Sequence, residues 1–262
     1  MKKFRLIDDA FFSACFDDNA KDVEYILRII LEKADLKVLK VQTQKSVENI
    51  YGRSVRFDVF ATDTKGKLYN IEVQRADSGA IPQRARYNSV MLDYHELKKQ
   101  EGFKELPESF VVFITENDVI GDGEKIYHAD RIIRETGKDF NDGTHIIYVN
   151  GSYKGEKGKP LDDLIHDFFC ANPSEMRHKQ LAERVSFLKE NKGDVGKMSN
   201  IIAEIFKDEI AEAAQKAAAE SEKKKLLENI RSLMETTKWT AKQAMDALKV
   251  PEKEQEKYIA LI

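Results

Sequence analysis

The architecture follows from one stretch, Arg53-Ser-Val-Arg-Phe-Asp-Val-Phe-Ala-Thr-Asp63, which Thr64-Lys-Gly66 joins to Lys67-Leu-Tyr-Asn-Ile-Glu-Val-Gln74. Apolar and polar residues alternate on both sides of the loop, and this period of two is typical of strands with one buried face. Gly66 ends the three-residue loop, where a hairpin of this length needs a left-handed residue. The stretch therefore predicts a β-hairpin whose apolar sets are Val55, Phe57 and Val59 on the first strand and Tyr69, Ile71 and Val73 on the second.

The hairpin loop also determines which side chains face one another across the two strands. Pairing of Asp63 with Lys67 places Asp58 directly opposite Glu72, and Gln74 then shares their face. Two carboxylates held side by side repel each other unless a proton or a cation lies between them. Mg²⁺ prefers carboxylate and water oxygens, so the pair predicts a divalent-metal site.

A second interpretation of the same pair is a polar, solvated face of an antiparallel hairpin, which is common where one face of a sheet meets water. Directly opposed like charges are unfavourable in a sheet, and this cost favours the metal site over the solvated face. For Gln74 taken by itself, a surface glutamine is the simpler interpretation.

An Asp, a hairpin turn and then Glu-x-Lys form the signature of the PD-(D/E)XK nuclease superfamily, and this chain has glutamine in place of the lysine. The segments Asn70-Ile-Glu-Val-Gln74 and Arg84-Ala-Arg-Tyr-Asn88 resemble one branch more closely, the Rpn-type recombination-promoting nucleases, which also carry the label of transposases. The similarity extends from about Phe11 to about Pro173. It implies a restriction-endonuclease-like fold.

The resemblance implies a role for each residue of the hairpin motif. Asp58 and Glu72 would bind Mg²⁺, for which Mn²⁺ can substitute, together with the backbone carbonyl of Val73. Such a metal lowers the pKa of a bound water and neutralises charge that develops on the phosphate. Gln74 stands where the superfamily has the lysine that orients the attacking water, and its amide can position water without supplying the field of an ammonium. The candidate catalytic residues are Asp58, Glu72 and Gln74.

Two further groups are candidates by the same resemblance. Pro82–Leu97 has helical character, with Arg84 and Tyr87 at a spacing that places them on one stripe near the catalytic face. They would bind substrate, the arginine by gripping a phosphate in bidentate fashion; an exposed arginine and a half-buried tyrosine packed on the sheet are equally compatible with the pattern. Glu24 matches a place where related nucleases add an acidic residue, although a solvated helix glutamate is the simpler interpretation.

Composition places limits on the class of protein. The 262 residues carry a formal net charge of −3, with 42% hydrophobic and 34% charged residues, which argues against strong nonspecific binding to duplex DNA but leaves room for local basic patches. No apolar run reaches membrane-spanning length, no secretory segment is expected at the amino terminus, and two isolated cysteines suit a reducing compartment. We therefore expect a cytoplasmic protein without a membrane partner. The histidines and cysteines lack zinc-site spacing.

The rest of the chain predicts an α/β fold, with a mixed sheet flanked by helices and a helical carboxy-terminal region. Residues 1–172 would form the nuclease-like domain and residues 173–262 an assembly or small helix-turn-helix region. In that second region Ile201, Ile202, Ile205 and Phe206 make one apolar stripe, and Ala211–Ala219 begins a long exposed helix that suits a homo-oligomer. The expected elements of the first domain are helices at Val23–Lys33 and Leu161–Phe169 and strands at Lys37–Thr43, Ser109–Thr115 and Thr144–Asn150.

Two hypotheses for function follow. The first is a metal-dependent DNA endonuclease that hydrolyses phosphodiester bonds and is linked to recombination or mobile DNA. The second is a catalytically weak or inactive nuclease-fold module for nucleic-acid binding or protein assembly, which the missing lysine and the low net charge favour. Replacement of Gln74 by lysine separates them.

Overall fold

The computed structural model describes residues 3–98, 100–190, 221, 223–248, 250–251, 255 and 258–259. The chain divides into two compact units, residues 1–202 and 203–262. The expected apolar stripe at Ile201–Phe206 and the expected helix at Ala211–Ala219 lie outside the described residues. Among the described helices, none combines the length and the apolar character that crossing a membrane requires.

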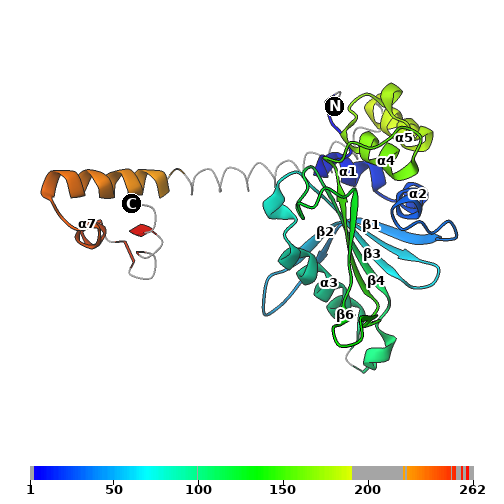
Figure 1. The fold of residues 1–262 in the computed structure, drawn as a ribbon, viewed down its shortest axis with the longest axis horizontal. Coiled ribbons are helices and arrows are strands. Elements are labelled where there is room, and N and C mark those ends of the chain that lie inside the picture. Colours follow the sequence, from blue (N-terminus) through cyan, green and yellow to red (C-terminus); the bar gives the residue numbers. More distant parts are fainter. Residues whose placement is uncertain are drawn as a thin grey trace. The chain divides into compact units, whose positions relative to one another are not determined.

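A mixed six-stranded sheet forms the first unit (Figure 1). The strand order is β1-β2-β3-β4-β8-β5, with β3, β4 and β8 parallel to one another and the other neighbours antiparallel. This confirms the predicted α/β class and the hairpin. The strands are β1 (Val38–Val47), β2 (Val55–Asp63), β3 (Leu68–Gln74), β4 (Ser109–Thr115), β5 (Ile126–Ala129) and β8 (Thr144–Asn150).

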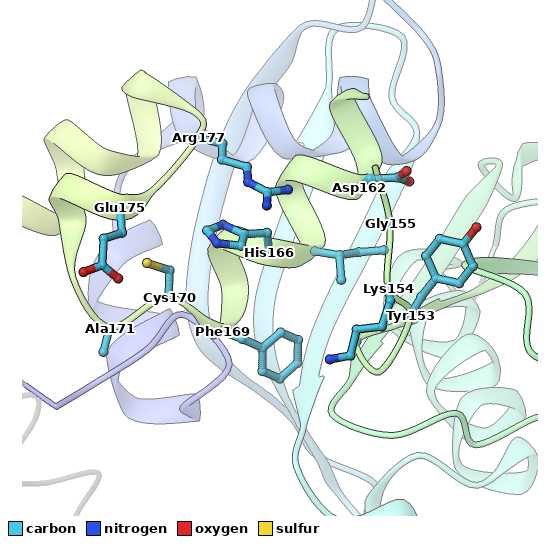
Figure 2. Close-up of a pocket in the computed structure, with 12 residues that line it drawn as sticks. Tyr153, Lys154, Gly155, Asp162, His166, Phe169, Cys170, Ala171, Glu175 and Arg177 are labelled. Atoms are coloured by element: carbon cyan, nitrogen blue, oxygen red, sulfur yellow. The ribbon is translucent and has the colours of Figure 1, made fainter. Parts of the chain in front are cut away.

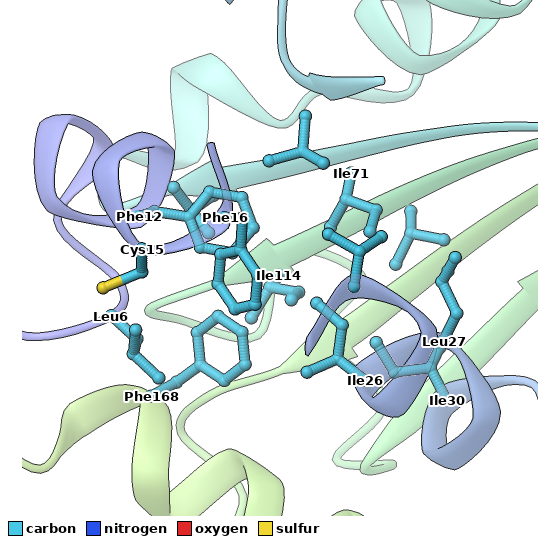
Figure 3. Close-up of a cluster of buried hydrophobic side chains, with 14 of the residues drawn as sticks. Leu6, Phe12, Cys15, Phe16, Ile26, Leu27, Ile30, Ile71, Ile114 and Phe168 are labelled. Atoms are coloured by element: carbon cyan, nitrogen blue, oxygen red, sulfur yellow. The ribbon is translucent and has the colours of Figure 1, made fainter. Parts of the chain in front are cut away.

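Helices cover both faces of this sheet. One face packs against a large apolar cluster that draws residues from four helices, and Figure 3 shows its aromatic centre, where Phe12 and Phe16 meet Phe168. These helices are α1 (Asp9–Phe16), α2 (Ala20–Ile30), α4 (Pro160–Phe169) and α5 (Lys179–Glu190). The other face carries a smaller cluster under α3 (Pro82–Glu96). Because both faces of the sheet are covered, β4 is buried along its whole length and is apolar from Phe110 to Ile114.

The hairpin of β1 and β2 changes face midway. Val41 and Val59 belong to the large cluster, whereas Val47 and Phe57 belong to the cluster under α3, although all four have the same parity in their strands. Gln44 lies at the change with a φ of +50°, a left-handed conformation that reverses the side-chain alternation. The prediction that Phe57 shares a face with Val59 is therefore wrong, because alternation assumes an uninterrupted extended backbone.

Short elements complete the first unit. A two-stranded ribbon, β6 (Ile132–Ile133) and β7 (Lys138–Asp139), lies in the chain between β5 and β8, in a region for which the sequence analysis predicts no strand. Three single turns of 3₁₀ helix are η1 (Asp77–Gly79), η2 (Phe103–Glu105) and η3 (Pro173–Glu175).

The described part of the second unit is helical. Residues 223–237 form one helix, and α7 (Ala241–Ala247) follows after a turn. Thr240 and Gln243 cap α7 reciprocally, which satisfies backbone donors at its start. A small apolar core of Ile230, Ala244, Met245 and Val250 joins the two helices.

The helix α5 lies beyond the expected boundary at residues 172 and 173, yet it contributes Leu181, Val185 and Leu188 to the large cluster of the first unit. The compact unit defined by the structure therefore extends past α5. The assignment of residues 1–172 to the nuclease-like domain and of 173–262 to an assembly region stays a prediction.

Candidate active site

The ladder between β2 and β3 opens at Asp58. Paired residues run from Thr62 and Leu68 to Val59 and Ile71, in the register that the loop predicts. Hydrogen-bonded pairs alternate in such a ladder, so Phe57 and Val73 would form the next one. Instead, the Val73 N–H donates to Oδ2 of Asp58 at 3.0 Å. A carboxylate has thus replaced a backbone carbonyl as the acceptor at the end of the strand pair.

Glu72 lies beside this opening and is fully buried. Its Oε1 accepts from the backbone N–H of Asp58 at 3.4 Å, and its Oε2 accepts from Nη2 of Arg84 at 3.0 Å. Asp58 itself is 5% exposed and Glu72 0% exposed. The alternative of a solvated polar face does not describe this pair, because α3 covers it and an arginine of that helix reaches the buried carboxylate.

Both carboxylates have raised pKa values. Burial raises the pKa of Glu72 to about 7, against the opposing effect of the nearby Arg84 guanidinium. For Asp58, burial and then the charges of Glu72 and Asp9 raise the pKa well above its ordinary value, against the Val73 N–H and Arg84. The arrangement therefore holds two ionisable groups whose negative charges are poorly compensated by the protein, and an added cation would stabilise their ionised forms.

Arg84 closes the site from the α3 side. Besides its contact with Glu72, its Nη1 donates to the carbonyl of Gly79 at 2.9 Å. Two contacts leave other donors of the guanidinium, which carries five N–H groups, and the side chain is partly exposed. The geometry thus fits a group that neutralises Glu72 and also faces an incoming anion.

Gln74 lies next to this arginine at the mouth of the site. The space that a side chain on Gly79 would need is filled by the Gln74 Oε1, and Nη1 of Arg84 is 3.5 Å from the same point. Glycine at position 79 therefore permits the amide of Gln74 and the guanidinium of Arg84 to approach each other. The structure brings together Asp58, Glu72, Gln74 and Arg84, as the sequence predicts for one site.

Tyr87 lies one helical turn further along α3 and contacts another part of the molecule. Its hydroxyl donates to the backbone carbonyl of Arg53 and accepts from Nδ2 of Asn49, both in the loop between β1 and β2. Its printed contacts thus connect α3 to that loop, away from the carboxylates. Binding of substrate by Tyr87 stays a prediction.

Asp9 is an acidic neighbour that the sequence analysis missed. It lies at the start of α1, its charge raises the pKa of both Asp58 and Glu72, and its Oδ1 accepts from Nε2 of Gln44 at 3.2 Å. An aspartate in the first turn of a helix is ordinary, so no local signal marks it. The other acidic candidate, Glu24, instead accepts from the Val38 N–H and forms ion pairs with Arg28 and Lys37.

The donor set fits a hard divalent cation held by few protein ligands. No group of three or more histidine, cysteine, aspartate or glutamate side chains suited to a metal occurs among the described residues. Two carboxylates are nevertheless within the range for Mg²⁺, which keeps several waters. The Val73 N–H points towards Asp58, and the carbonyl of the same strand residue points to the same side. Asp58, Glu72 and the Val73 carbonyl are the groups that the family resemblance implies as ligands.

A separate cavity of about 390 Å³ lies beside α4 (Figure 2). Its wall includes Lys154, His166, Cys170 and Arg177, and neither Asp58 nor Glu72 belongs to it. Both native cysteines are free: Cys15 is buried in the large cluster and Cys170 lies in this wall, and burial raises the pKa of each thiol.

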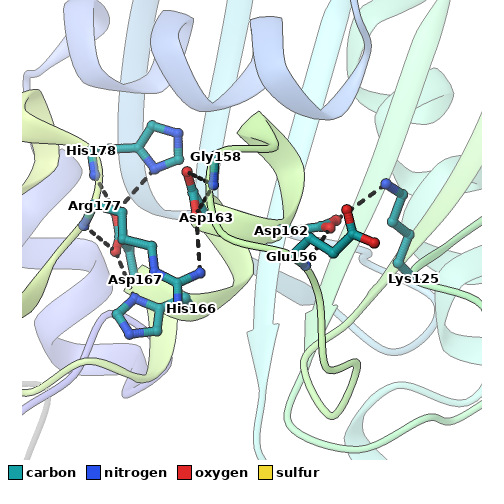
Figure 4. A network of polar contacts seen from close by, with 9 residues as sticks. All are labelled: Lys125, Glu156, Gly158, Asp162, Asp163, His166, Asp167, Arg177 and His178. Atoms are coloured by element: carbon teal, nitrogen blue, oxygen red, sulfur yellow. Dashed lines mark hydrogen bonds and ion pairs between the residues drawn. The ribbon is translucent and has the colours of Figure 1, made fainter.

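A polar network centred on Asp167 shares His166 and Arg177 with the wall of this cavity (Figure 4). The buried carboxylate accepts from the backbone N–H groups of Arg177 and His178 at 2.7 and 2.8 Å, and from the Nδ1 atoms of His178 and His166 at 3.0 and 3.1 Å. Burial alone would raise its pKa, but these donors together lower the pKa of Asp167. The network ties the end of α4 to the start of α5.

The fold and the site together define a mixed α/β sheet with paired buried carboxylates at the open end of a hairpin. Comparison with family models assigns residues 21–232 to the PD-(D/E)XK nuclease family transposases, and the chain belongs to this family. The match begins after Asp9. Comparisons with curated proteins and with solved structures found no match to this chain.

Proposed function

We propose that this chain is a metal-dependent DNA endonuclease that hydrolyses phosphodiester bonds. The observation that carries the proposal is the opening of the strand pair at Asp58, where a buried aspartate and a buried glutamate converge and the backbone N–H of Val73 holds the aspartate. Poorly compensated carboxylates in a polar opening are what a divalent cation requires. Membership of a nuclease family supports the same activity.

In the proposed reaction each residue has a part that its geometry allows. Asp58, Glu72 and the Val73 carbonyl would hold Mg²⁺ or Mn²⁺, which supplies Lewis-acid stabilisation of the phosphate and a more acidic water. Gln74 would orient the attacking water through its amide. Arg84, which already lies over Glu72, would hold the phosphate with its remaining donors.

Cleavage of supercoiled plasmid tests the proposal. Wild type is compared with Asp58→Ala and Glu72→Ala in Mg²⁺, in Mn²⁺ and with chelator. Cleavage that requires the metal and both carboxylates supports the endonuclease. Cleavage that survives both substitutions contradicts this site, and a wild type without cleavage or metal binding contradicts the activity.

A second candidate is a nuclease-fold module that binds nucleic acid without turnover. The specific observation that favours it is Gln74, because an amide replaces the superfamily's lysine beside the carboxylate pair. The substitution Gln74→Lys separates the two candidates. Faster cleavage would mark a competent but slow site, whereas no cleavage and no metal binding would favour the binding module.

A link to recombination or mobile DNA is also part of the proposal. The family carries the description of transposases. Hydrolysis of a phosphodiester bond is the step that the proposed residues account for, and strand transfer is outside this proposal. DNA is the proposed substrate, a homo-oligomer through the carboxy-terminal helices is the proposed assembly, and the cytoplasm is the proposed location.

A further inference from the structure

The loop between β1 and β2 presents two large apolar side chains to solvent. In this loop, residues 48–54, Ile50 is 81% exposed and Tyr51 is 95% exposed. Two adjacent apolar side chains that are this exposed contribute almost no stabilisation through burial of apolar surface. A functional contact is the simplest reason to keep both at the end of a hairpin, and we call residues 48–54 the hairpin tip.

The hairpin tip has a defined conformation. Asn49 accepts from the Tyr51 N–H at 3.1 Å, its own N–H donates to Oγ of Ser54 at 3.1 Å, and its Nδ2 donates to the hydroxyl of Tyr87 at 3.3 Å. Tyr87 in turn donates to the carbonyl of Arg53. The bonds connect the two ends of the tip with α3, the helix whose Arg84 reaches Glu72. The exposed pair is thus presented on a preorganised support, which reduces the entropic cost of binding.

The hairpin tip lies at the same end of the sheet as the carboxylates. Since β2 runs antiparallel to β3, the start of β2 and the Gln74 end of β3 coincide. Tyr51 and Asp58 are seven positions apart in the chain, a span of at most about 23 Å in an extended strand. This distance is shorter than one turn of duplex DNA, about 34 Å, so one substrate can contact both places.

The charges around the tip are suited to a polyanion. Arg53 and Arg56 are exposed at the base of the tip, and within the described part of the chain Arg53 has no carboxylate partner. Glu48 is the one acidic residue between Val47 and Val55. The tip therefore combines an aromatic ring, an apolar neighbour and the Arg53 side chain, which is the combination that stacks on bases while contacting the backbone.

We propose that the hairpin tip binds the nucleic-acid substrate, with Tyr51 stacked on a nucleobase, Ile50 packed against the neighbouring base and Arg53 on a phosphate, within one helical turn of the bond at Asp58 and Glu72. This inference rests on the proposed function for the identity of the substrate, but it concerns recognition and not cleavage. Tyr87 then acts as a positioning residue that holds the tip.

Binding of a labelled duplex by the full chain tests the proposal. The chain carries Asp58→Asn so that cleavage does not interfere, and fluorescence anisotropy measures the Kd for a fluorescein-labelled duplex of about 30 base pairs, three helical turns, with a short single-stranded gap at its centre that leaves base faces free for stacking. Stacking on one base contributes about 1–3 kcal/mol, so Tyr51→Ala should weaken binding about 5- to 150-fold. Tyr51→Phe keeps the ring and should bind within about twofold of the parent.

Phe103→Ala is the matched control. Phe103 is an aromatic residue that is 83% exposed in η2, directly before β4 and therefore at the opposite end of the sheet. Its loss should leave the Kd unchanged. Unchanged thermal melting of all variants shows that the fold is intact, as expected for side chains that contact little of the protein.

The salt dependence of the Kd separates stacking from charge. Tyr51→Ala should leave the slope of log Kd against log salt unchanged, whereas Arg53→Ala should reduce that slope by about one. A Kd for Tyr51→Ala equal to that of the parent overturns the proposal, as does an equal loss in Tyr51→Phe. Cleavage by wild type is measured in parallel: tip-dependent binding without cleavage contradicts the proposed function alone, and cleavage with a tip-independent Kd contradicts this inference alone.

Discussion

Asp167 and the Asp58–Glu72 pair are both buried carboxylates, and the protein treats them in opposite ways. Asp167 accepts four hydrogen bonds, which lower its pKa despite its burial. Asp58 and Glu72 receive fewer donors and lie beside each other, so the pKa of each is raised. A fully satisfied buried charge stabilises a fold, whereas a buried charge left without compensation marks a candidate functional site.

The largest effect is expected from substitutions in the uncompensated Asp58–Glu72 pair. Asp58→Ala or Glu72→Ala removes a proposed metal ligand, and the lost stabilisation of several kcal/mol should reduce cleavage about a thousandfold or more. Initial rates of plasmid nicking at saturating Mg²⁺ measure it. Asp167→Ala serves as the control, since its loss should leave the rate per folded molecule unaltered.

Asp167→Ala should instead act on stability. It leaves the buried ring of His178 and two backbone N–H groups without their acceptor, at a cost of about 3 kcal/mol in the free energy of unfolding. Urea unfolding followed by circular dichroism measures the change. A loss below about 1 kcal/mol would contradict the view that this network secures α4 to α5.

The pH dependence of stability is a further test of the contrast between Asp167 and the Asp58–Glu72 pair. The pKa of Asp167 is lowered in the folded state, so its contribution is fully present above the ordinary aspartate pKa, near 3.8, and is lost as the pH falls through the lower folded value. Below pH 4, wild type should therefore lose stability more steeply than Asp167→Asn. Parallel curves for the two proteins in urea titrations between pH 2 and pH 5 would contradict the assignment.

A substitution at Asp58 is expected to change the free energy of unfolding by less than Asp167→Ala does, and in the opposite direction. Asp58→Asn keeps an acceptor for the Val73 N–H but removes a poorly compensated buried charge, so in chelator it should raise the free energy of unfolding by about 1 kcal/mol. The proposed site predicts that Mg²⁺ raises the Tm of wild type by binding to the native state, and Asp58→Asn should abolish that rise. Differential scanning calorimetry with and without Mg²⁺ measures both; destabilisation in chelator would indicate that the charge is compensated after all.

The smallest effect is expected at the mouth of the site, where Gly79 lies against Gln74. A methyl group in Gly79→Ala would meet the Oε1 of Gln74, the far end of a flexible side chain that can move aside. Stability should change by less than about 1 kcal/mol, while cleavage should fall severalfold because the amide no longer lies beside Arg84. In a Gln74→Ala background Gly79→Ala should have no further effect, and an equal severalfold fall there would contradict a role for the amide.

Local patterns were sufficient for much of the sheet. The strands Ser109–Thr115 and Thr144–Asn150 coincide with the predicted runs, and the loop at Gly66 determines the register that brings Asp58 to Glu72. These features depend on residues close together in the chain. The fold class is predictable for the same reason.

The remaining features depend on contacts that the local sequence does not signal. Apolar residues lie on most sides of α1, so it lacks the periodicity that would identify it, and Asp9 at its start looks like any helix-capping acid. The reversal of faces at Gln44 requires a left-handed residue that is neither glycine nor asparagine. Asp167 resembles a surface aspartate until α5 folds back and supplies the donors of Arg177 and His178.

Because the two native thiols are buried, a label can be attached selectively at the hairpin tip. Cys15 is completely buried and Cys170 is 8% exposed, and a raised pKa keeps both in the unreactive thiol form. A cysteine introduced at position 51 would be almost fully exposed by comparison. Alkylating dyes and disulfide-bearing oligonucleotides would then react at one place in the described part of the molecule, without prior removal of the native cysteines. The core that buries Cys15 thus also makes the wild-type chain a ready scaffold for site-specific labelling.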